Sequence, residues 1–239
     1  MVEKNRLLNS KYIIYQDDEW FKFSLDSVLL VNFVTLNFRC KKIIDLACGN
    51  GAIAMLLSLK TKASIEGIEL QKCVYDLGAK SIIENKMSNQ INLVNGDIRN
   101  INSFYQPDSF DTVVSNPPYF NTNIDGFYNL NEIKKIARHE VYLNLDDLFS
   151  AVFYLLKSGG NFAFVHRSDR LIEIIDKLRK YHLEPKRIQF IYPKKDRNSD
   201  LFLLEATKNG KTGIKVLPEI IVHNIDGSYC DNIRHLFDL

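Results

Sequence analysis

Cysteine is scarce in this sequence, and no group of residues is spaced like the ligands of a metal. Four cysteines occur in 239 residues, and the five histidines are not clustered. The cysteines lie far apart and form no CxxC pair, at Cys40, Cys48, Cys73 and Cys230. Disulfide frameworks and zinc sites need several cysteines or histidines at short, regular spacings. The sequence therefore predicts a protein of a reducing compartment that holds no metal ion.

Long hydrophobic runs and an excess of one charge are also absent. The most apolar early run, Val28 to Leu36, is interrupted by Asn32 and is far shorter than the roughly 20 residues of a membrane span. The N-terminus lacks the basic-then-apolar pattern of a secretion signal. Lysine and arginine total 31 against 29 for aspartate and glutamate, so only a local patch could attract a polyanion. We expect a cytoplasmic protein, monomeric and without membrane contact.

Short β-branched runs alternate with helical stretches, which is typical of a parallel sheet covered on both faces. The expected strands are residues 42–46, 63–70, 91–94, 110–115, 161–165, 187–192 and 201–207. The expected helices are 52–59, 72–85, 145–156 and 170–181, and Ser158-Gly159-Gly160 stops the third of them. The sequence thus predicts an α/β fold, a doubly wound and mostly parallel seven-stranded sheet that ends in an antiparallel hairpin.

The length fits one domain. We expect its catalytic core over residues 41–207, after an N-terminal segment 1–40 and before a C-terminal extension 208–239. The N-terminal segment has an aromatic and charged stretch, Trp20 to Asp26, and then a helix-like apolar run from Ser27. Two interpretations of this segment stay open: a cap over the functional site, or a helix packed on the edge of the sheet.

Polar residues follow three successive strands of the predicted sheet. Asp45 to Gly51 joins the first strand to its helix, Glu69 ends the second strand, and Asp97-Ile98 follows the third. Ligands of doubly wound sheets bind beyond the carboxyl ends of the strands, where a carboxylate about 20 residues after the glycine loop can accept ribose hydroxyls. These residues indicate a nucleoside site, although a tight turn without a ligand would use similar residues. Neither GxGxxG nor GxxxxGK[ST] occurs, which disfavours nicotinamide dinucleotides and P-loop ATP.

The fourth strand ends in Asn116-Pro117-Pro118-Tyr119, the most specific motif of the chain. The Asn116 amide and the Pro117 carbonyl can both accept hydrogen bonds from an NH₂ group, and the prolines hold these acceptors rigid. Such acceptors favour a pyramidal nitrogen whose lone pair can attack. Tyr119 can stack on a base. A Pro-Pro turn that only ends a strand is the alternative.

A basic segment lies late in the chain. Residues 177–197 contain eight lysines and arginines against two acidic residues, and we expect Lys186, Arg187, Lys194, Lys195 and Arg197 to bind phosphates. The alternative is a solvated charged hairpin. Arg138 is a weaker candidate, because a salt bridge to Glu140 or Glu132 would explain it equally well.

These motifs resemble those of class I S-adenosylmethionine-dependent methyltransferases that modify amino groups. Over the whole chain the sequence is similar to the bacterial tRNA(Val) adenine N6-methyltransferases. The further marks are the stretches Phe23–Leu30, Ala137–Glu140 and Ile225–Tyr229. Ala47 departs from the family, in which many members have a glycine at this place; alanine is small enough that we expect the cofactor to fit.

The resemblance implies S-adenosylmethionine as cofactor and tRNA as partner, with methylation of the adenosine just 3′ of the anticodon, position 37. It implies a catalytic role for Asn116, Pro117, Pro118 and Tyr119. It implies that the cofactor contacts are Asp26, Asp45, Cys48, Gly49, Asn50, Gly51, Glu69, Leu70, Asp97, Ile98 and Asn116.

Three other functions stay open. A motif that holds an amino group also suits a glutamine amide, so N5-methylation of a protein such as a release factor is the main alternative. It ranks below RNA, because that class usually carries a longer helical N-terminal domain and only about 40 residues precede Asp45. DNA adenine methylation ranks third, because sequence-specific DNA readers normally add a recognition domain, for which we see no room. A non-catalytic RNA-binding module on the same scaffold is disfavoured, because Glu69, Asp97 and Asn116 are all present.

Overall fold

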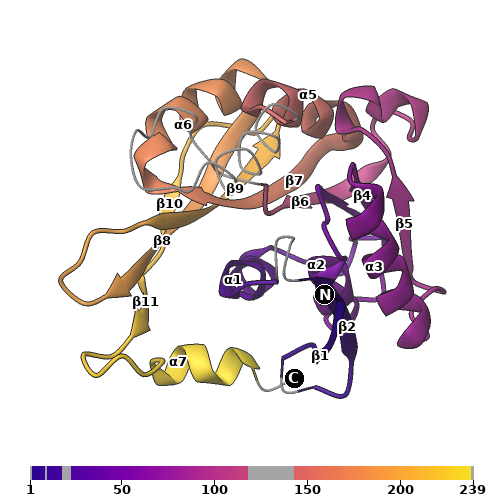
Figure 1. Cartoon of the computed structure of the whole chain (residues 1–239). Helices are drawn as coiled ribbons and strands as arrows, with labels where there is room; N and C mark the ends of the chain where they lie inside the picture. Colours follow the sequence, from indigo (N-terminus) through magenta and orange to yellow (C-terminus); the bar gives the residue numbers. More distant parts are fainter. Residues whose placement is uncertain (1, 9, 18–22, 118–142, 238–239) are drawn as a thin grey trace, which may run out of the picture.

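A sheet of nine strands runs through the molecule, with helices on both of its faces (Figure 1). The computed structural model describes residues 2–8, 10–17, 23–117 and 143–237. Within them, the strands of the main sheet are β3 (Lys42–Leu46), β4 (Ser64–Glu69), β5 (Ile91–Asn95), β6 (Phe110–Ser115), β7 (Leu156–Arg167), β8 (Leu183–Lys194), β9 (Leu201–Lys208), β10 (Lys215–Val216) and β11 (Ile220–His223). The principal helices are α1 (Leu25–Phe33), α2 (Ala52–Ser58), α3 (Lys72–Glu84), α5 (Leu145–Leu155), α6 (Leu171–Lys180) and the short α7 (Asp231–Arg234).

The order of the strands confirms the predicted doubly wound sheet, but the sheet has nine strands and not seven, because β10 and β11 are added beside β8. The order is β10-β8-β9-β7-β6-β3-β4-β5, with β11 on the outer side of β8. β9 is antiparallel to β7 and to β8, and the other pairs of this sheet are parallel. The chain leaves β3 toward β4 and later returns to β6 on its other side, so the order reverses between β3 and β6. Ligands of such sheets bind at this reversal, at the edge where the parallel strands end, called the carboxyl edge below.

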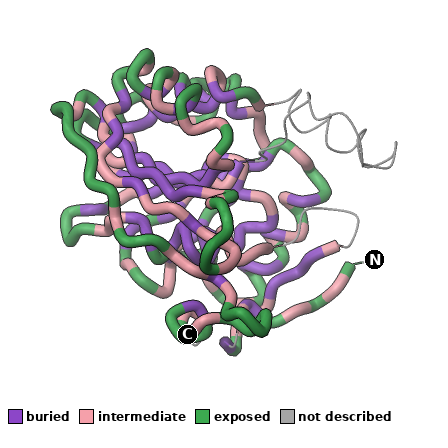
Figure 2. The backbone as a smooth tube through the Cα atoms, turned by 90° about the vertical axis from the view of Figure 1, so that its left-hand side faces the viewer, coloured by how far each residue is buried: buried purple, intermediate pink, exposed green. Residues whose placement is uncertain are grey.

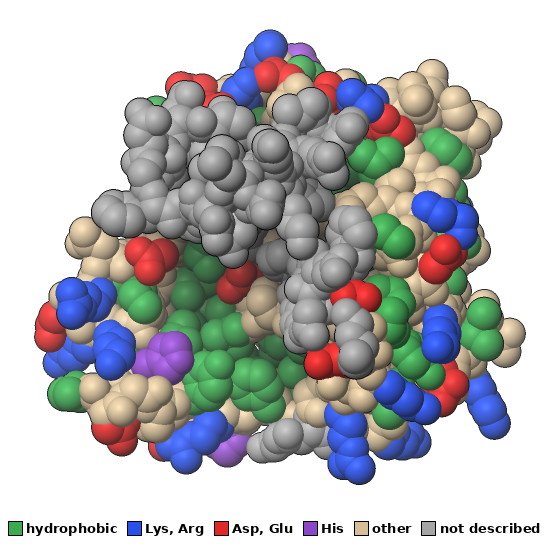
Figure 3. All heavy atoms as spheres, in the orientation of Figure 1, with side chains coloured by type: hydrophobic (Ala, Val, Ile, Leu, Met, Phe, Trp, Pro, Cys, Tyr) green, Lys and Arg blue, Asp and Glu red, His purple; other side chains and the backbone are tan. Residues whose placement is uncertain are grey.

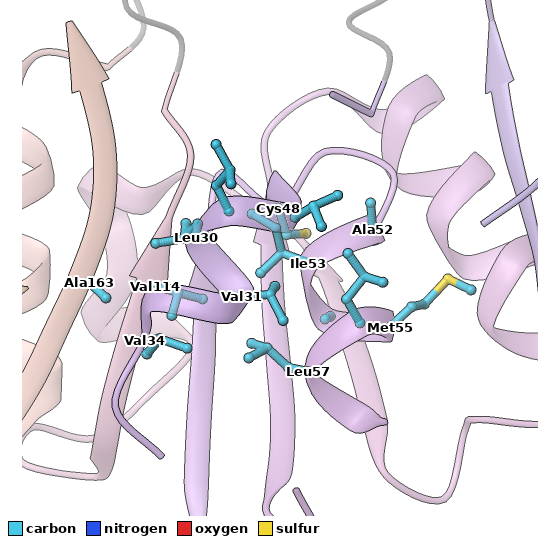
Figure 4. Packing of buried hydrophobic residues seen from close by; sticks show 14 of the residues in the cluster. Leu30, Val31, Val34, Cys48, Ala52, Ile53, Met55, Leu57, Val114 and Ala163 are labelled. Atoms are coloured by element: carbon cyan, nitrogen blue, oxygen red, sulfur yellow. The ribbon is translucent and has the colours of Figure 1, made fainter. Parts of the chain in front are cut away.

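Two hydrophobic layers hold the sheet between the helices. In β3, Ile43 packs in the cluster that contains α1 and α2, and Ile44 packs in the cluster that contains α5 and α6. Phe164 and Val165 alternate between the same two clusters in β7. This period of two in buried strands is what a sheet covered on both faces requires. Figure 2 shows the buried strands between more exposed helices, and Figure 4 shows α1 and α2 packed over β6 and β7.

The predicted strands and helices are present with small shifts, except at the starts of β7 and β8; β8 begins at Leu183, four residues before the predicted start. Helix α5 ends at Leu155, and β7 begins at once with Leu156, five residues before the predicted start. Ser158-Gly159-Gly160 therefore does not separate the two elements but forms an irregularity inside β7, between the partners Phe110↔Leu156 and Thr112↔Asn161. A Cβ on Gly160 would lie 2.9 Å from the Lys157 carbonyl oxygen and 3.0 Å from that of Asp111, which explains the glycine.

The N-terminal segment contains a hairpin that the sequence did not predict. Strands β1 (Val2–Arg6) and β2 (Ile13–Asp17) pair antiparallel and lie against α3. The Tyr15 N–H donates to the Ser81 hydroxyl over 2.9 Å, and the Asn85 amide exchanges two hydrogen bonds with the backbone of Ile13. The helix-like run from Ser27 corresponds to α1. The last residues also join the main fold, because β10 and β11 extend the sheet beside β8.

Candidate functional site

The loop after β3 brings its backbone to the carboxyl edge in a left-handed conformation. Ala47, Gly49 and Gly51 have φ values of +56°, +56° and +79°. A Cβ on Gly49 would meet no atom within 4 Å, so the space beside this turn is open. The left-handed region costs an L-residue about 1–2 kcal/mol, and Ala47 therefore carries strain that a glycine would not. The backbone at Gly49 therefore leaves room for close approach by a ligand, and the contact with a cofactor stays a prediction.

Glu69 ties this loop to the end of β4. One carboxylate oxygen accepts the Gly49 N–H over 2.9 Å, and the other accepts the Gln71 N–H over 2.8 Å. The side chain is only 6% exposed, and this burial raises its pKa although the hydrogen bonds oppose the shift. Each oxygen keeps a second acceptor position, so Glu69 can hold the loop and accept ribose hydroxyls at the same time.

Asp45 is buried without a hydrogen-bond donor. Its side chain is 0% exposed, and neither carboxylate oxygen has a hydrogen-bond partner among the residues that the structure describes. Burial, and then the nearby charge of Glu69, raise its pKa well above the ordinary aspartate value. A buried polar group without a partner costs about 1–3 kcal/mol, and more when it is charged. A cationic ligand group would relieve this cost, so the residues present fit a nucleoside ligand that carries an ammonium group.

Cys48 and Asn50 have structural contacts inside the same loop. The Cys48 N–H donates to the Ile68 carbonyl over 3.1 Å, and its buried thiol has a raised pKa because burial disfavours the thiolate. The Asn50 amide donates to the Tyr15 carbonyl over 3.2 Å and so joins the loop to β2. Both residues were predicted to touch the cofactor, and the contacts found here hold the loop in shape.

The end of β5 offers a mixed polar and apolar surface. The Asp97 carboxylate accepts hydrogen bonds from the backbone and the guanidinium of Arg99, with a shortest distance of 2.6 Å, which lowers its pKa. Ile98 is buried beneath it, and Leu70 is 39% exposed. An exposed leucine beside a carboxylate is the pattern expected for an adenine site, although the Asp97 oxygens are already engaged by Arg99.

The acceptor side begins at the end of β6, opposite the loop. Asn116 is half-buried, and its Nδ2 donates to the Ser27 hydroxyl of α1 over 3.1 Å, so its amide oxygen is the end turned away from Ser27. Pro117 is buried, and Asp26 is half-buried in the first turn of α1 next to Ser27. The other predicted residues of this side, Pro118, Tyr119 and Arg138, lie outside the described residues. Helix α1 thus contacts the acceptor motif directly.

The basic segment 177–197 is divided between two edges of the sheet. Lys177 and Lys180 at the end of α6 both pair with Asp146. Because α6 leads back to the start of β8, these residues lie at the amino edge, away from the carboxyl edge. Lys186 follows near the start of β8, where its ammonium donates to the Lys211 carbonyl over 2.8 Å.

Arg187 is half-buried near the same edge and is bound by other parts of the protein. Its guanidinium lies 3.3 Å from Glu205, 3.2 Å from the Phe33 carbonyl oxygen and 4.6 Å from the centre of the Phe33 ring. Glu205 is buried, and it also accepts hydrogen bonds from Thr35. These contacts give the Arg187 side chain a structural role and do not support its predicted role in RNA binding.

Lys194 is the last residue of β8 and Lys195 and Arg197 follow it, so all three lie at the carboxyl edge. Lys195 and Arg197 are exposed and have no carboxylate partner among the described residues. The Lys194 ammonium donates to the Ile225 carbonyl over 3.3 Å. Of the predicted phosphate ligands that the structure describes, these three have a position suited to that role.

Sequence reasoning missed the residues at the end of β7. Continuing the register Ser115↔Phe164 by two residues brings His166 beside Pro117, one strand spacing away, and Arg167 follows it at the end of β7. His166 is 1% exposed, and burial lowers its pKa to about 4. Its Nδ1 accepts the Arg167 N–H over 2.8 Å, so the neutral ring carries its proton on Nε2. The predicted strand ended at residue 165, so these two side chains received no role.

The turn after β7 is joined to the basic loop after β8. The Ser168 N–H donates to the Asp200 carbonyl over 3.0 Å, and the hydroxyls of Ser168 and Ser199 are 3.0 Å apart. Arg167 pairs with Asp169, and Arg170 pairs with Glu173. The arginines near the end of β7, Arg167 and Arg170, and the lysines near the end of β8, Lys194 and Lys195, therefore lie at the same carboxyl edge. On this side of the molecule, Figure 3 shows a hollow with hydrophobic side chains on its floor and side chains of both charges around it.

Two classes of site are not found in the described part of the chain. No three histidine, cysteine or acidic side chains of the described residues gather as metal ligands. None of the described helices combines the length and the apolar character that a membrane crossing needs.

The doubly wound sheet, the open glycine turn and the amide-proline motif together define a class I methyltransferase. Residues 21–175, more than half of the chain, match the family model of the methyltransferase small domain. The chain belongs to this family, which confirms the resemblance drawn from the sequence.

Curated relatives cover nearly the whole chain. A protein of Parabacteroides distasonis named tRNA1(Val) (adenine(37)-N6)-methyltransferase is 29% identical over 200 residues, 82% of this chain and 81% of the relative. A protein of the same name from Bacteroides thetaiotaomicron is 26% identical over 95% of this chain and 94% of its own.

Solved structures support the fold. A predicted O-methyltransferase of Agrobacterium tumefaciens is similar with a TM-score of 0.70 at 19% identity, over 89% of this chain and 95% of its own. Geranyl diphosphate C-methyltransferase of Streptomyces coelicolor A3(2), solved with S-adenosyl-L-homocysteine, has a TM-score of 0.58 at 13% identity over 76% of both chains.

Proposed function

We propose that this protein transfers a methyl group from S-adenosylmethionine to N6 of adenosine 37 in tRNA1(Val). The observation that carries the proposal is the similarity, over nearly the full length of both chains, to relatives that bear this activity in their names. The arrangement of Asp45, Glu69 and Asn116 around one edge of the sheet supports it, because these residues suit the two substrates of such a transfer.

The cofactor supplies a methyl group bound to a positively charged sulfur. Asp45 would receive its ammonium group, which would give the buried carboxylate a partner that the described residues do not supply. Glu69 would accept the ribose hydroxyls, and the open side of Gly49 would admit the ligand against the backbone. Leu70, Asp97 and Ile98 would border the adenine. In this assignment the cofactor contacts the acidic and apolar side chains at the ends of the strands.

The target amino group would be held by the Asn116 amide oxygen and the Pro117 carbonyl. An exocyclic base amine is a poor nucleophile because its lone pair is delocalised into the ring. Two acceptors on its hydrogens stabilise the pyramidal form that attacks the methyl group, and alignment of nitrogen, methyl and sulfur lowers the barrier further. Ser27 fixes the orientation of the amide from α1. The roles of Pro118 and Tyr119 stay predictions.

The tRNA would approach the carboxyl edge, where its phosphates meet the loops after β7 and β8. Lys194, Lys195 and Arg197 supply cations there, and Arg167 and Arg170 add two guanidinium groups held in place by acidic neighbours. The target base must leave its stack, which costs a few kcal/mol and costs least for an unpaired loop base. A cytoplasmic, monomeric enzyme agrees with this substrate, and both properties stay predictions.

A labelled-methyl assay tests the proposal. The protein is incubated with labelled S-adenosylmethionine and, in parallel, unmodified total tRNA, release factor protein or duplex DNA, followed by nucleoside and peptide analysis. We expect label in N6-methyladenosine of tRNA. Label only on release factor would favour the glutamine alternative, and label only on DNA would also contradict the proposal.

Replacement of Asn116 by alanine tests the role of this residue in holding the target amino group. Asn116→Ala should lower turnover by at least about 100-fold, because a preorganised acceptor contributes about this much to catalysis. Its affinity for S-adenosylmethionine should stay within a few fold of the wild type. Asn92→Ala, which removes an exposed amide of β5 bound to Glu66, is the control and should keep full activity. A loss of cofactor affinity by orders of magnitude in Asn116→Ala would overturn the role assigned to this residue.

A further inference from the structure

The chain returns to the carboxyl edge close to its C-terminus. β11 runs parallel to β8, and the register Ile221↔Tyr192 and His223↔Lys194 carries it to the same edge as the proposed RNA-binding loops. It ends in a turn, residues 224–229, called the C-terminal turn below. In Figure 1 this segment leaves the β8 side of the molecule and leads to α7. β11 lies four strand positions from β6, about 19 Å at the usual spacing of about 4.8 Å.

The C-terminal turn is held by an unusually dense set of hydrogen bonds for a surface loop. The Asn224 N–H donates to the Ser228 carbonyl over 2.8 Å, and the Gly227 N–H donates to the Asn224 carbonyl over 3.1 Å. Both the backbone and the hydroxyl of Ser228 donate to the Asp226 carboxylate, over 2.9 and 2.7 Å. These bonds fix a conformation that the chain would otherwise have to order when a partner binds.

The fixed turn displays an apolar side chain to solvent. Ile225 at its tip is 93% exposed, so it contributes nothing to the packing of the protein. Behind it, the Tyr229 ring stacks on His223 with 4.9 Å between ring centres and is itself 39% exposed. The His223 Nδ1 lies 3.1 Å from the Pro193 carbonyl oxygen, which anchors this pair to the end of β8.

The apolar tip lies directly beside positive charge. The Lys194 ammonium donates to the Ile225 carbonyl over 3.3 Å, and Lys195 and Arg197 follow in the same loop. An exposed aliphatic side chain on a rigid turn next to cations suits a partner that offers both flat apolar surfaces and phosphates. Unpaired RNA nucleotides have both features.

We infer that the C-terminal turn is an RNA-docking surface that binds unpaired nucleotides near, but not at, the methylated adenosine. Ile225 packs against a base, while the Lys194–Arg197 loop binds the neighbouring phosphates. At four strand positions from Asn116, the turn contributes to the choice of RNA and does not take part in methyl transfer. The inference rests on the proposed function, because it assumes that RNA is the substrate.

Ile225→Ala tests this surface, with Ile172→Ala as the matched control. Ile172 is 71% exposed on α6, so both variants remove the same exposed side chain. For Ile225→Ala we expect the KM for tRNA and the Kd for RNA to rise about three- to tenfold, because part of the isoleucine side chain is buried against a base. The kcat, the Kd for S-adenosylmethionine and the Tm should stay unchanged, and Ile172→Ala should equal the wild type throughout.

The salt dependence of RNA binding separates the apolar contact from the charged one. Ile225→Ala should weaken binding without changing the slope of log K against log salt, because no counterion is released by an aliphatic contact. Wild-type KM and Kd values in Ile225→Ala would overturn the inference. So would a wild-type dimer that this variant dissociates, because the tip would then dock a second copy. Absence of methyl transfer to RNA by the wild type would instead contradict the proposed function.

Discussion

Replacing Asp45 by asparagine should make the ligand-free protein more stable and its binding of cofactor weaker. The side chain is 0% exposed, and neither of its oxygens has a hydrogen-bond partner in the described part of the structure. Asparagine keeps the size of the side chain and removes the carboxylate, whose ionisation burial and Glu69 both disfavour. At neutral pH the gain should be about 1–2 kcal/mol, the lower part of the range for an unsatisfied buried group, because the amide is also polar. For a chain of this length, this corresponds to a Tm higher by about 2–8 °C.

The pH dependence gives the sign of this effect independently. A carboxyl group whose pKa is raised on folding keeps its proton in the folded state at pH values where the unfolded chain, with an aspartate pKa of about 3.9, has lost it. The contribution of Asp45 to stability is therefore complete below about pH 4 and is lost as the pH rises through its folded pKa, by about 1.4 kcal/mol per unit. Asp45→Asn should remove this part of the slope, while Glu69, whose pKa is also raised, should retain its own part.

Thermal unfolding across the pH range and calorimetric titration with S-adenosylmethionine measure both effects. We expect the affinity of Asp45→Asn to fall about 10- to 100-fold, because a hydrogen bond to a charged group contributes about 1.5–3 kcal/mol. Asp111→Asn is a control of opposite sign: this carboxylate pairs with Lys157 at 2.6 Å and has a lowered pKa, so its loss should reduce stability. A less stable Asp45→Asn protein at neutral pH, or unchanged cofactor affinity, would refute the reasoning.

Three further outcomes follow from the same structure. Ala47→Gly should raise the free energy of unfolding by about 0.5–1 kcal/mol in denaturant titrations, because φ is +56° at this residue; a decrease would show that the turn is unstrained. Arg187→Ala should lower the free energy of unfolding by about 2–3 kcal/mol, because Glu205 would be left buried without its cation. The RNA affinity of the folded protein should stay unchanged, and a selective loss of RNA binding would restore the predicted RNA role. A triple replacement by alanine should reduce the salt slope of RNA binding by about two units, and an unchanged slope would place the RNA elsewhere. The three residues are Lys194, Lys195 and Arg197.

The sequence predicted the sheet well because its strands are buried on both faces. The run Phe110–Ser115, for example, has three consecutive β-branched residues, Thr112 to Val114, and all three are buried in the structure. The N-terminal hairpin was missed because β1 has no apolar run and the apolar run of β2, Ile13 to Tyr15, is short. β1 is half exposed, and what holds β2 in place is a set of long-range bonds to Ser81 and Asn85 on α3.

The sequence indicated the residues of the candidate site that stand at the ends of single strands. Asp45, Glu69 and Asn116 could be chosen because each ends a recognisable strand, and parallel strands bring their ends to one edge. The contact between Ser27 and Asn116 joins residues far apart in the chain, so no local pattern predicts it.

The basic residues show the limit of counting charges along a sequence. The excess of positive charge in residues 177–197 is partly cancelled by acidic residues from other parts of the chain, which come near only in the folded protein. Asp146 pairs with Lys177 and Lys180, and Glu205 pairs with Arg187. The turns of the sheet then separate the remaining cations between its two edges, so that a continuous basic stretch becomes two surfaces.

Mapping of the modified nucleotide in tRNA tests the central claim most directly. Unmodified tRNA1(Val) is incubated with the protein and S-adenosylmethionine, digested, and its fragments are analysed by mass spectrometry. We expect one added methyl group, on the fragment that contains adenosine 37, formed at least about 100-fold more slowly when Asn116 is replaced by alanine. A methyl group on another nucleotide, or no methylation of this tRNA by a protein that binds the cofactor, would contradict it.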